Sequence, residues 1–165
     1  MKIVFRIVVF VALIALGVWL WTIAFPSPEK IVRNQLAKLA QDVSFSQDEN
    51  NLIKMAHAQS VADFFSENVD VNIDVPGHEQ QTIAGRDQIT QAALVSRQQL
   101  TALDVKFPDI TVTVAPDKNS ATADLTVEAA VSGEHDAIVQ EMKFTFQKIN
   151  GHWLITKVET VKTVS

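Results

Sequence analysis

The chain has 165 residues with 14 basic and 19 acidic side chains, no cysteine and a formal net charge of −5. The lack of cysteine excludes disulfides, thiolate metal sites and a catalytic thiol. The only charged side chains among the first 28 residues are two basic ones, so residues 29–165 carry 12 basic and 19 acidic side chains and a formal charge of −7. Because this charge disfavours nucleic acid and anionic membrane surfaces, we expect no nucleic-acid partner.

An apolar segment lies near the N-terminus. Residues 7–25 are apolar or glycine apart from Thr22, and Lys2 and Arg6 come just before them. A helix of roughly 20 such residues crosses a bilayer, so the segment predicts a single-pass membrane anchor with a cytoplasmic N-terminus and an extracytoplasmic C-terminal domain. The alternative is a cleaved signal peptide, with Thr22 and Ala24 as the small residues near the cleavage site, and a secreted or periplasmic domain.

The chain therefore divides into an anchor, or signal peptide, with a short linker at residues 1–28 and one domain at residues 29–165. The first half of this domain has the period of amphipathic helices. A helix start at Ser27–Pro28 predicts a first helix to about Asp42, and a capping box at residues 46–49 predicts a second helix that ends near Ser66. Asp87 opens a third helix, on which one face carries Ile89, Ala92, Ala93, Ser96 and Leu100.

Alternation of apolar and polar residues predicts strands elsewhere in the domain. A half-exposed strand starts at Asn68, a weak one covers residues 81–83, and everything after Ala102 is strand-like, with a bulge or bend at Pro108 and a hairpin turn at Asn150-Gly151. The remaining strands are expected at residues 121–131, 138–146 and 153–164. This order predicts an α+β domain in which a curved, mixed or antiparallel sheet wraps around three helices.

Three sequence segments make the domain similar to the nuclear transport factor 2-like (NTF2-like) superfamily, and within it to SnoaL-like and ketosteroid-isomerase-like proteins. They are residues 61–65 (VADFF) running into 69–71, residues 83–89 (IAGRDQI), and residues 144–146 (FTF) through 151–155 (GHWLI). The resemblance implies a cone-shaped α+β fold over nearly all of residues 29–165. It does not imply one activity, because the superfamily contains isomerases, cyclases, dehydratases, transport factors and assembly modules.

The sequence offers few residues for catalysis. Steroid-isomerase-like members use a tyrosine to stabilise the oxyanion, and this chain has no tyrosine, so that role has no counterpart here. Asp70 and Asp74 alternate with the apolar residues of their strand and are expected to face away from the core. We assign no catalytic residue, cofactor or metal ligand; the candidate pocket residues are His57, beside an apolar helix face, and Gln140, which lies in a core-facing register.

These observations favour a membrane-tethered, extracytoplasmic NTF2-like domain that acts as a non-catalytic binding or assembly module. The alternative is a SnoaL-like isomerase, cyclase or dehydratase that acts on a small apolar substrate. The expected partners are the bilayer, through residues 7–25, an envelope protein or a small apolar ligand, and a second copy of the chain. The homodimer would form through the outer face of the sheet, where polar side chains alternate on two strands: Thr122, Asp124, Thr126 and Glu128, with Glu141, Lys143 and Thr145.

Overall fold

The computed structural model describes residues 11–17, 26–46, 50–74, 80–133 and 137–161. Residues 11–17 are helical. The elements that follow are α2 (Pro28–Val43), α3 (Asn51–Ala62), β1 (Phe65–Ile73), β2 (Gln81–Ala84), α4 (Arg86–Gln99), β3 (Leu103–Lys106), β4 (Ile110–Val114), β5 (Ser120–Val131), β6 (Ile138–Ile149) and β7 (His152–Thr160).

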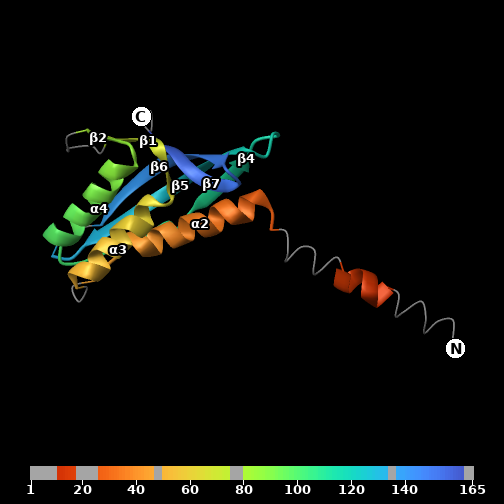
Figure 1. Cartoon of the computed structure of the whole chain (residues 1–165), viewed down its shortest axis with the longest axis horizontal. Coiled ribbons are helices and arrows are strands. Elements are labelled where there is room, and N and C mark those ends of the chain that lie inside the picture. The colour runs from red at the N-terminus through yellow and green to blue at the C-terminus, as the bar shows by residue number, and fades with distance from the viewer. Residues whose placement is uncertain (1–10, 18–25, 47–49, 75–79, 134–136, 162–165) are drawn as a thin grey trace.

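The strands form one curved, mixed sheet in the order β2-β1-β7-β6-β5-β3, and β4 also pairs with β5. Neighbouring strands are antiparallel except β1 and β7, which run parallel. Figure 1 shows α2 and α3 along one side of the sheet and α4 near one end of it. The sheet and the helices therefore enclose a common interior, as an α+β cone requires.

The core occupies this interior because each strand turns alternate side chains inward. On β5 and β6 the buried inner positions include Ala123, Leu125, Phe144 and Phe146, and Phe146 is fully buried. Helix α2 packs its fully buried Val32 and Leu36 against this layer. Burial of this apolar surface supplies the main favourable term for folding the domain.

The first helix agrees with its predicted bounds, whereas the second helix does not. The first is confirmed: Ser27 caps α2 by accepting a hydrogen bond from the Lys30 N–H. The second is shorter than predicted, because it begins after the cap residue Asn50 and ends at Ala62. The predicted extension to Ser66 is wrong, since β1 already starts at Phe65 and pairs there with β7. Of the predicted capping box at residues 46–49, residues 47–49 lie outside the described residues.

Among the later elements, the weak strand, the third helix and the final hairpin are confirmed. Asn150 and Gly151 have φ angles of 51° and 84°, the left-handed backbone that a two-residue hairpin turn requires. The single bent strand predicted around Pro108 is instead two strands, β3 and β4, which pair with successive parts of β5. Proline has no backbone N–H to donate to the ladder, which explains why pairing stops there. Strand β7 ends at Thr160, and residues 162–165 lie outside the described residues.

Only residues 11–17 of the predicted membrane anchor at 7–25 are described. They are helical, and all seven are exposed. Within the described ranges, no helix has both the length and the apolar character needed to cross a membrane.

Candidate functional site

A cavity of about 290 Å³ lies inside the cone, between the helices and the concave face of the sheet. Its lining is almost entirely apolar and comes from α2, α3 and α4 and from strands β1–β3 and β5–β7. Representative lining residues are Leu39, Val61, Ile89, Val105, Met142 and Phe144. Concave, mostly apolar cavities of this kind are where small molecules bind in proteins, so we take it as the candidate functional site.

Among the described lining residues two are polar, Ser96 and Arg97, and they are neighbours in the last turn of α4. Arg97 is only 1% exposed. Its guanidinium group donates a hydrogen bond to the carbonyl of Asp42, near the end of α2, and lies 4.9 Å from the centre of the Phe45 ring. The Ser96 hydroxyl donates to the carbonyl of Ala92 at 2.9 Å. The polar residues of the described lining thus lie together at one end of α4.

Helix geometry places Arg97 at this position. Ile89, Ala93 and Arg97 are spaced four residues apart and so share one face of α4, and all three line the cavity. The helix face predicted from the sequence included Ser96 but not Arg97. The spacing could have predicted Arg97 as a lining residue, because it lies four residues after Ala93 and therefore on the same inward face of the helix.

The cavity contains little that could perform acid–base chemistry. Among the described residues that line it there is no aspartate, glutamate, histidine or lysine. Shifted pKa values are found on exposed side chains elsewhere: hydrogen bonds to Asp104 and Glu159 raise the pKa values of Lys106 and Lys157, and the backbone N–H of Asn119 lowers that of Asp117. These surface contacts explain the shifts locally and do not mark a catalytic group in the cavity.

The two pocket residues proposed from the sequence do not line this cavity. His57 is half-buried on α3. Gln140 lies opposite Val127 on the inner face of the sheet, as predicted, but it is only half-buried and its side-chain amide donates to the carbonyl of Glu141 at 3.3 Å. The structure does not bring these two residues together at the cavity, so their role as ligand contacts stays a prediction.

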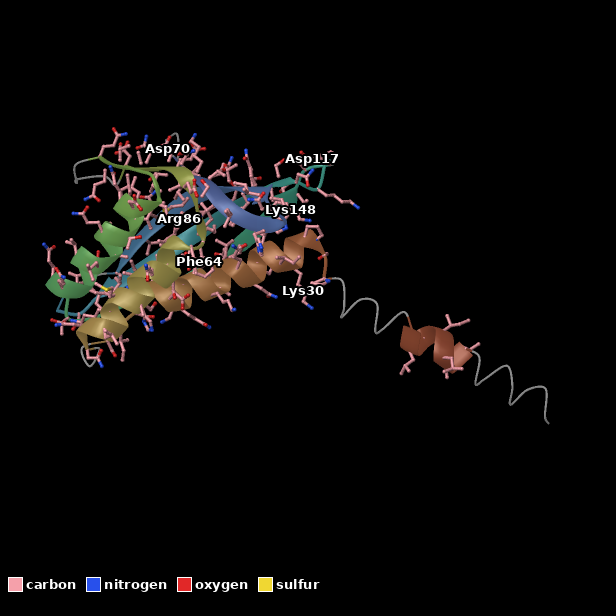
Figure 2. The ribbon with its side chains drawn as sticks, viewed as in Figure 1. Lys30, Phe64, Asp70, Arg86, Asp117 and Lys148 are labelled. Atoms are coloured by element: carbon pink, nitrogen blue, oxygen red, sulfur yellow. The ribbon has the colours of Figure 1, made fainter. Side chains whose placement is uncertain are left out.

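The carboxylates discussed for catalysis also lie away from the cavity lining. Asp70 is exposed on β1, as alternation predicted (Figure 2). It is paired in register with Lys157 on β7. Asp74 is half-buried just after the end of β1, where its backbone N–H donates to the hydroxyl of Thr160 at 3.0 Å. The described part of the chain contains no group of three or more histidine, cysteine, aspartate or glutamate side chains that could hold a metal ion.

Comparison with solved structures identifies the architecture. A protein from Novosphingobium aromaticivorans with an NTF2-like, cystatin-like fold matches with a TM-score of 0.60 and 20% identity, covering 88% of this chain and 86% of the other. The fold is NTF2-like. Two more structures from that organism match this chain. One, assigned as a scytalone dehydratase, has a TM-score of 0.59 and 16% identity, covering 82% of this chain and 83% of the other. The second, assigned as an aromatic ring hydroxylase, has a TM-score of 0.64 and 13% identity, covering 83% of this chain and 90% of the other.

No protein-family model matches the sequence. No curated protein matches it either. At these low identities the structural matches establish the NTF2-like fold and leave the activity open, because proteins with one fold perform unrelated functions.

Proposed function

We propose that this chain is a non-catalytic binding module whose NTF2-like cone encloses a small apolar ligand. The observation that carries the proposal is the cavity of about 290 Å³, in whose described lining Ser96 and Arg97 are the only polar residues. An apolar ligand gains roughly 25 cal/mol for each Å² of apolar surface that it removes from water, so burial alone supplies affinity. Acid–base catalysis would need a proton donor or acceptor beside the ligand with a pKa near neutrality, and the described lining contains no aspartate, glutamate, histidine or lysine.

Filling the cavity tests this proposal. We expect Ala93→Leu to weaken the binding of octan-1-ol by about tenfold or more, because the larger side chain occupies cavity space and removes ligand contacts. Ala93 lines the cavity on α4. Isothermal titration calorimetry on the full chain in phospholipid nanodiscs, with empty nanodiscs as the blank, measures the affinity.

The matched control is Ala56→Leu, the same change at an exposed position on α3. It should bind octan-1-ol as the unmodified chain does. Equal weakening by both substitutions, or no saturable binding to the unmodified chain, would contradict the cavity as a ligand site.

We further propose that residues 7–25 anchor the domain to a membrane and that the domain lies on the extracytoplasmic side. The support is the uninterrupted apolar sequence and the exposed helix at residues 11–17. A tether raises the local concentration of the domain for lipidic ligands and envelope proteins. Retention of the chain in membranes after alkaline extraction, together with digestion of the domain by protease added outside the inner membrane, is the expected result; release of the intact chain would contradict it.

A homodimer through the outer face of the sheet is part of the same proposal. The predicted polar row does lie on adjacent strands: Asp124 and Lys143 are in register, and their side chains form an ion pair at 3.5 Å. Antiparallel sheets commonly leave one such face available to solvent or to a partner. Analytical ultracentrifugation of the full chain should give the mass of two chains, and a monomer at all concentrations would contradict the dimer.

The assembly role is supported by a second surface feature. The first turns of α3 expose Leu52 to 82%, Met55 to 59% and Ile53 to 41%, which is unusual for clustered apolar side chains. Photo-crosslinking from position 52 in intact cells should capture an envelope protein if this surface serves assembly. Crosslinking no more efficient than from the exposed control position Gln59 would contradict that role.

The alternative function is a SnoaL-like isomerase, cyclase or dehydratase acting on a small apolar substrate. The observation that favours it is the fold shared with a structure assigned as a scytalone dehydratase. Native mass spectrometry of the full chain from its own cells should reveal a retained molecule under either function. Conversion of that molecule on incubation with the chain, followed by NMR because an isomerisation leaves the mass unchanged, would favour the enzyme over the binding module.

A further inference from the structure

A second hollow, an open groove of about 620 Å³, lies between helix α2 and the edge of the sheet formed by β3 and β4. The exposed residues Ala37 on α2 and Pro108 between β3 and β4 line it, so the groove reaches solvent. Apolar side chains make up most of its lining surface: Ala37, Ala40, Val105, Phe107, Pro108 and Ile110. An apolar ligand can therefore rest in the groove with part of its surface removed from water.

The groove and the cavity share two lining residues, Val105 and Phe107. Val105 is buried, and Phe107 is half-buried. The Phe107 ring also contacts the ring of Phe144, another cavity residue, with the ring centroids 6.2 Å apart and the planes inclined by 57°. A route from solvent to the cavity through this groove therefore passes Val105 and Phe107.

Val105 is held in place by hydrogen bonds. Its backbone N–H donates to the hydroxyl of Ser44 at 2.9 Å, and the pairing of β3 with β5 sets it opposite Ala129. The Ser44 hydroxyl in turn donates to the carbonyl of Ala40 at 2.7 Å, which attaches this end of the groove to the last turn of α2. Because displacement of Val105 would break these bonds, Val105 is not suited to open the route.

Phe107 lies instead at a bulge between β3 and β4. The pairing of β3 with β5 ends at Lys106 and that of β4 with β5 begins at Ile110, and the three residues between them face two on β5. A bulge interrupts the ladder and redirects a side chain, and bulges are common beside functional sites. Arg33 on α2 donates to the carbonyl of Ile110 at 2.8 Å and holds the far side of the break. Rotation of the Phe107 side chain therefore requires no change in either ladder.

We propose that this groove is the passage by which the ligand reaches the cavity and that the Phe107 ring is its gate. The passage is closed while the ring lies against Phe144, and rotation of the ring away from Phe144 joins the groove to the cavity. Such a step slows both entry and exit, because binding that requires a conformational change has a lower association rate constant. This inference rests on the proposed function, since it gives the route to the same cavity.

The groove can be blocked at a single position, because the chain has no cysteine of its own. Ala37→Cys, labelled with a poly(ethylene glycol) maleimide, places a bulky group in the groove. Stopped-flow fluorescence of 1-naphthylmethanol, on the full chain in nanodiscs with empty nanodiscs as the blank, measures the rates. We expect the label to lower the association and dissociation rate constants together by about tenfold or more, while the affinity, which depends only on the end states, changes less than about twofold.

The matched control is the same label on Ala56→Cys. Ala56 is exposed on α3 and lines neither the groove nor the cavity. Its label should leave both rate constants within about twofold of those of the unmodified chain.

Removing the gate is the complementary test. Phe107→Ala should raise the association rate constant about fivefold or more, because it removes the ring that closes the passage. Ile83→Ala is the control, since Ile83 is also half-buried and lines the cavity but not the groove. It should leave the association rate constant within about twofold. Circular dichroism confirms that each variant is folded, and Phe107→Leu provides the comparison if Phe107→Ala does not fold.

The possible results are distinct. If labelled Ala37→Cys binds 1-naphthylmethanol as fast as labelled Ala56→Cys, the ligand enters elsewhere, and the passage is overturned while the binding module stands. An association rate constant in Phe107→Ala no higher than in Ile83→Ala overturns the gate. Absence of saturable 1-naphthylmethanol binding to the unmodified chain overturns the proposed function, and the inference with it.

Discussion

Replacing Arg97 with methionine is expected to lower the free energy of unfolding by about 3 kcal/mol, as the sum of a lost hydrogen bond from a charged donor and a lost cation–π contact. Both interactions are buried: the guanidinium group donates to the Asp42 carbonyl and lies over the Phe45 ring. Methionine retains the length of the side chain and a similar helix propensity, so the change isolates the guanidinium group. Urea unfolding followed by circular dichroism measures the difference.

Arg33→Met is the control for this prediction. Arg33 also donates to a backbone carbonyl, that of Ile110 at 2.8 Å, but its side chain is 46% exposed. Solvent weakens such a contact, so a loss below about 1 kcal/mol is expected. Should Arg97→Met cost no more than Arg33→Met, the buried arginine would not be a major source of stability for the junction between α2 and α4.

Individual helices, strands and turns could be predicted because the sequence patterns that specify them lie within a few residues of each other. The Ser27 cap and the apolar spacing of α2 depend on residues within one or two helical turns, and the alternation on β5 and β6 depends on the strand alone. Asn150-Gly151 likewise specifies a hairpin turn by its own backbone preference. The three motifs that resemble the NTF2-like superfamily then predicted the arrangement of these elements, and the structural comparisons support that fold.

The errors occur where long-range contacts decide the structure. Phe64 and Phe65 continue the apolar spacing of α3, yet the carbonyl of Phe64 accepts a hydrogen bond from the Ile155 N–H at 2.9 Å, and pairing with β7 draws this segment into the sheet. The parallel pairing of β1 with β7 is likewise invisible to periodicity, since the two strands are separated by most of the domain.

The candidate site was harder to predict than the fold. Periodicity could place Arg97 on the inner face of α4, but a cavity is a space that all the surrounding elements leave unfilled, and no local pattern records it. Gln140 shows that a correct register does not by itself place a side chain at the cavity. Its inward register was predicted, yet the described lining includes Met142, two residues along the same strand face, and not Gln140. Register gives the direction of a side chain, whereas the packing of distant elements determines what that side chain meets.

Substituting Phe144 and Phe146 separately should distinguish a cavity-lining aromatic residue from a core one. Both are buried inner residues of β6, but Phe144 lines the cavity and Phe146 does not. Phe146→Ala should cost about 4–5 kcal/mol of unfolding free energy, because it empties a fully packed site. Phe144→Ala should cost about 3 kcal/mol, since its side chain borders the cavity and so has fewer packing contacts to lose. Urea unfolding of both variants provides the comparison.

Ligand selectivity separates the two variants more sharply than stability does. In Phe144→Ala the space of the lost ring joins the cavity, so the affinity for 1-naphthylmethanol relative to octan-1-ol should rise about fivefold, equivalent to about 1 kcal/mol. Phe146 does not line the cavity, so in Phe146→Ala the ratio should change less than about twofold. An equal change in both variants would mean that selectivity follows general loosening of the core, whereas the expected split would show that the space bordered by Phe144 is the one that receives the ligand.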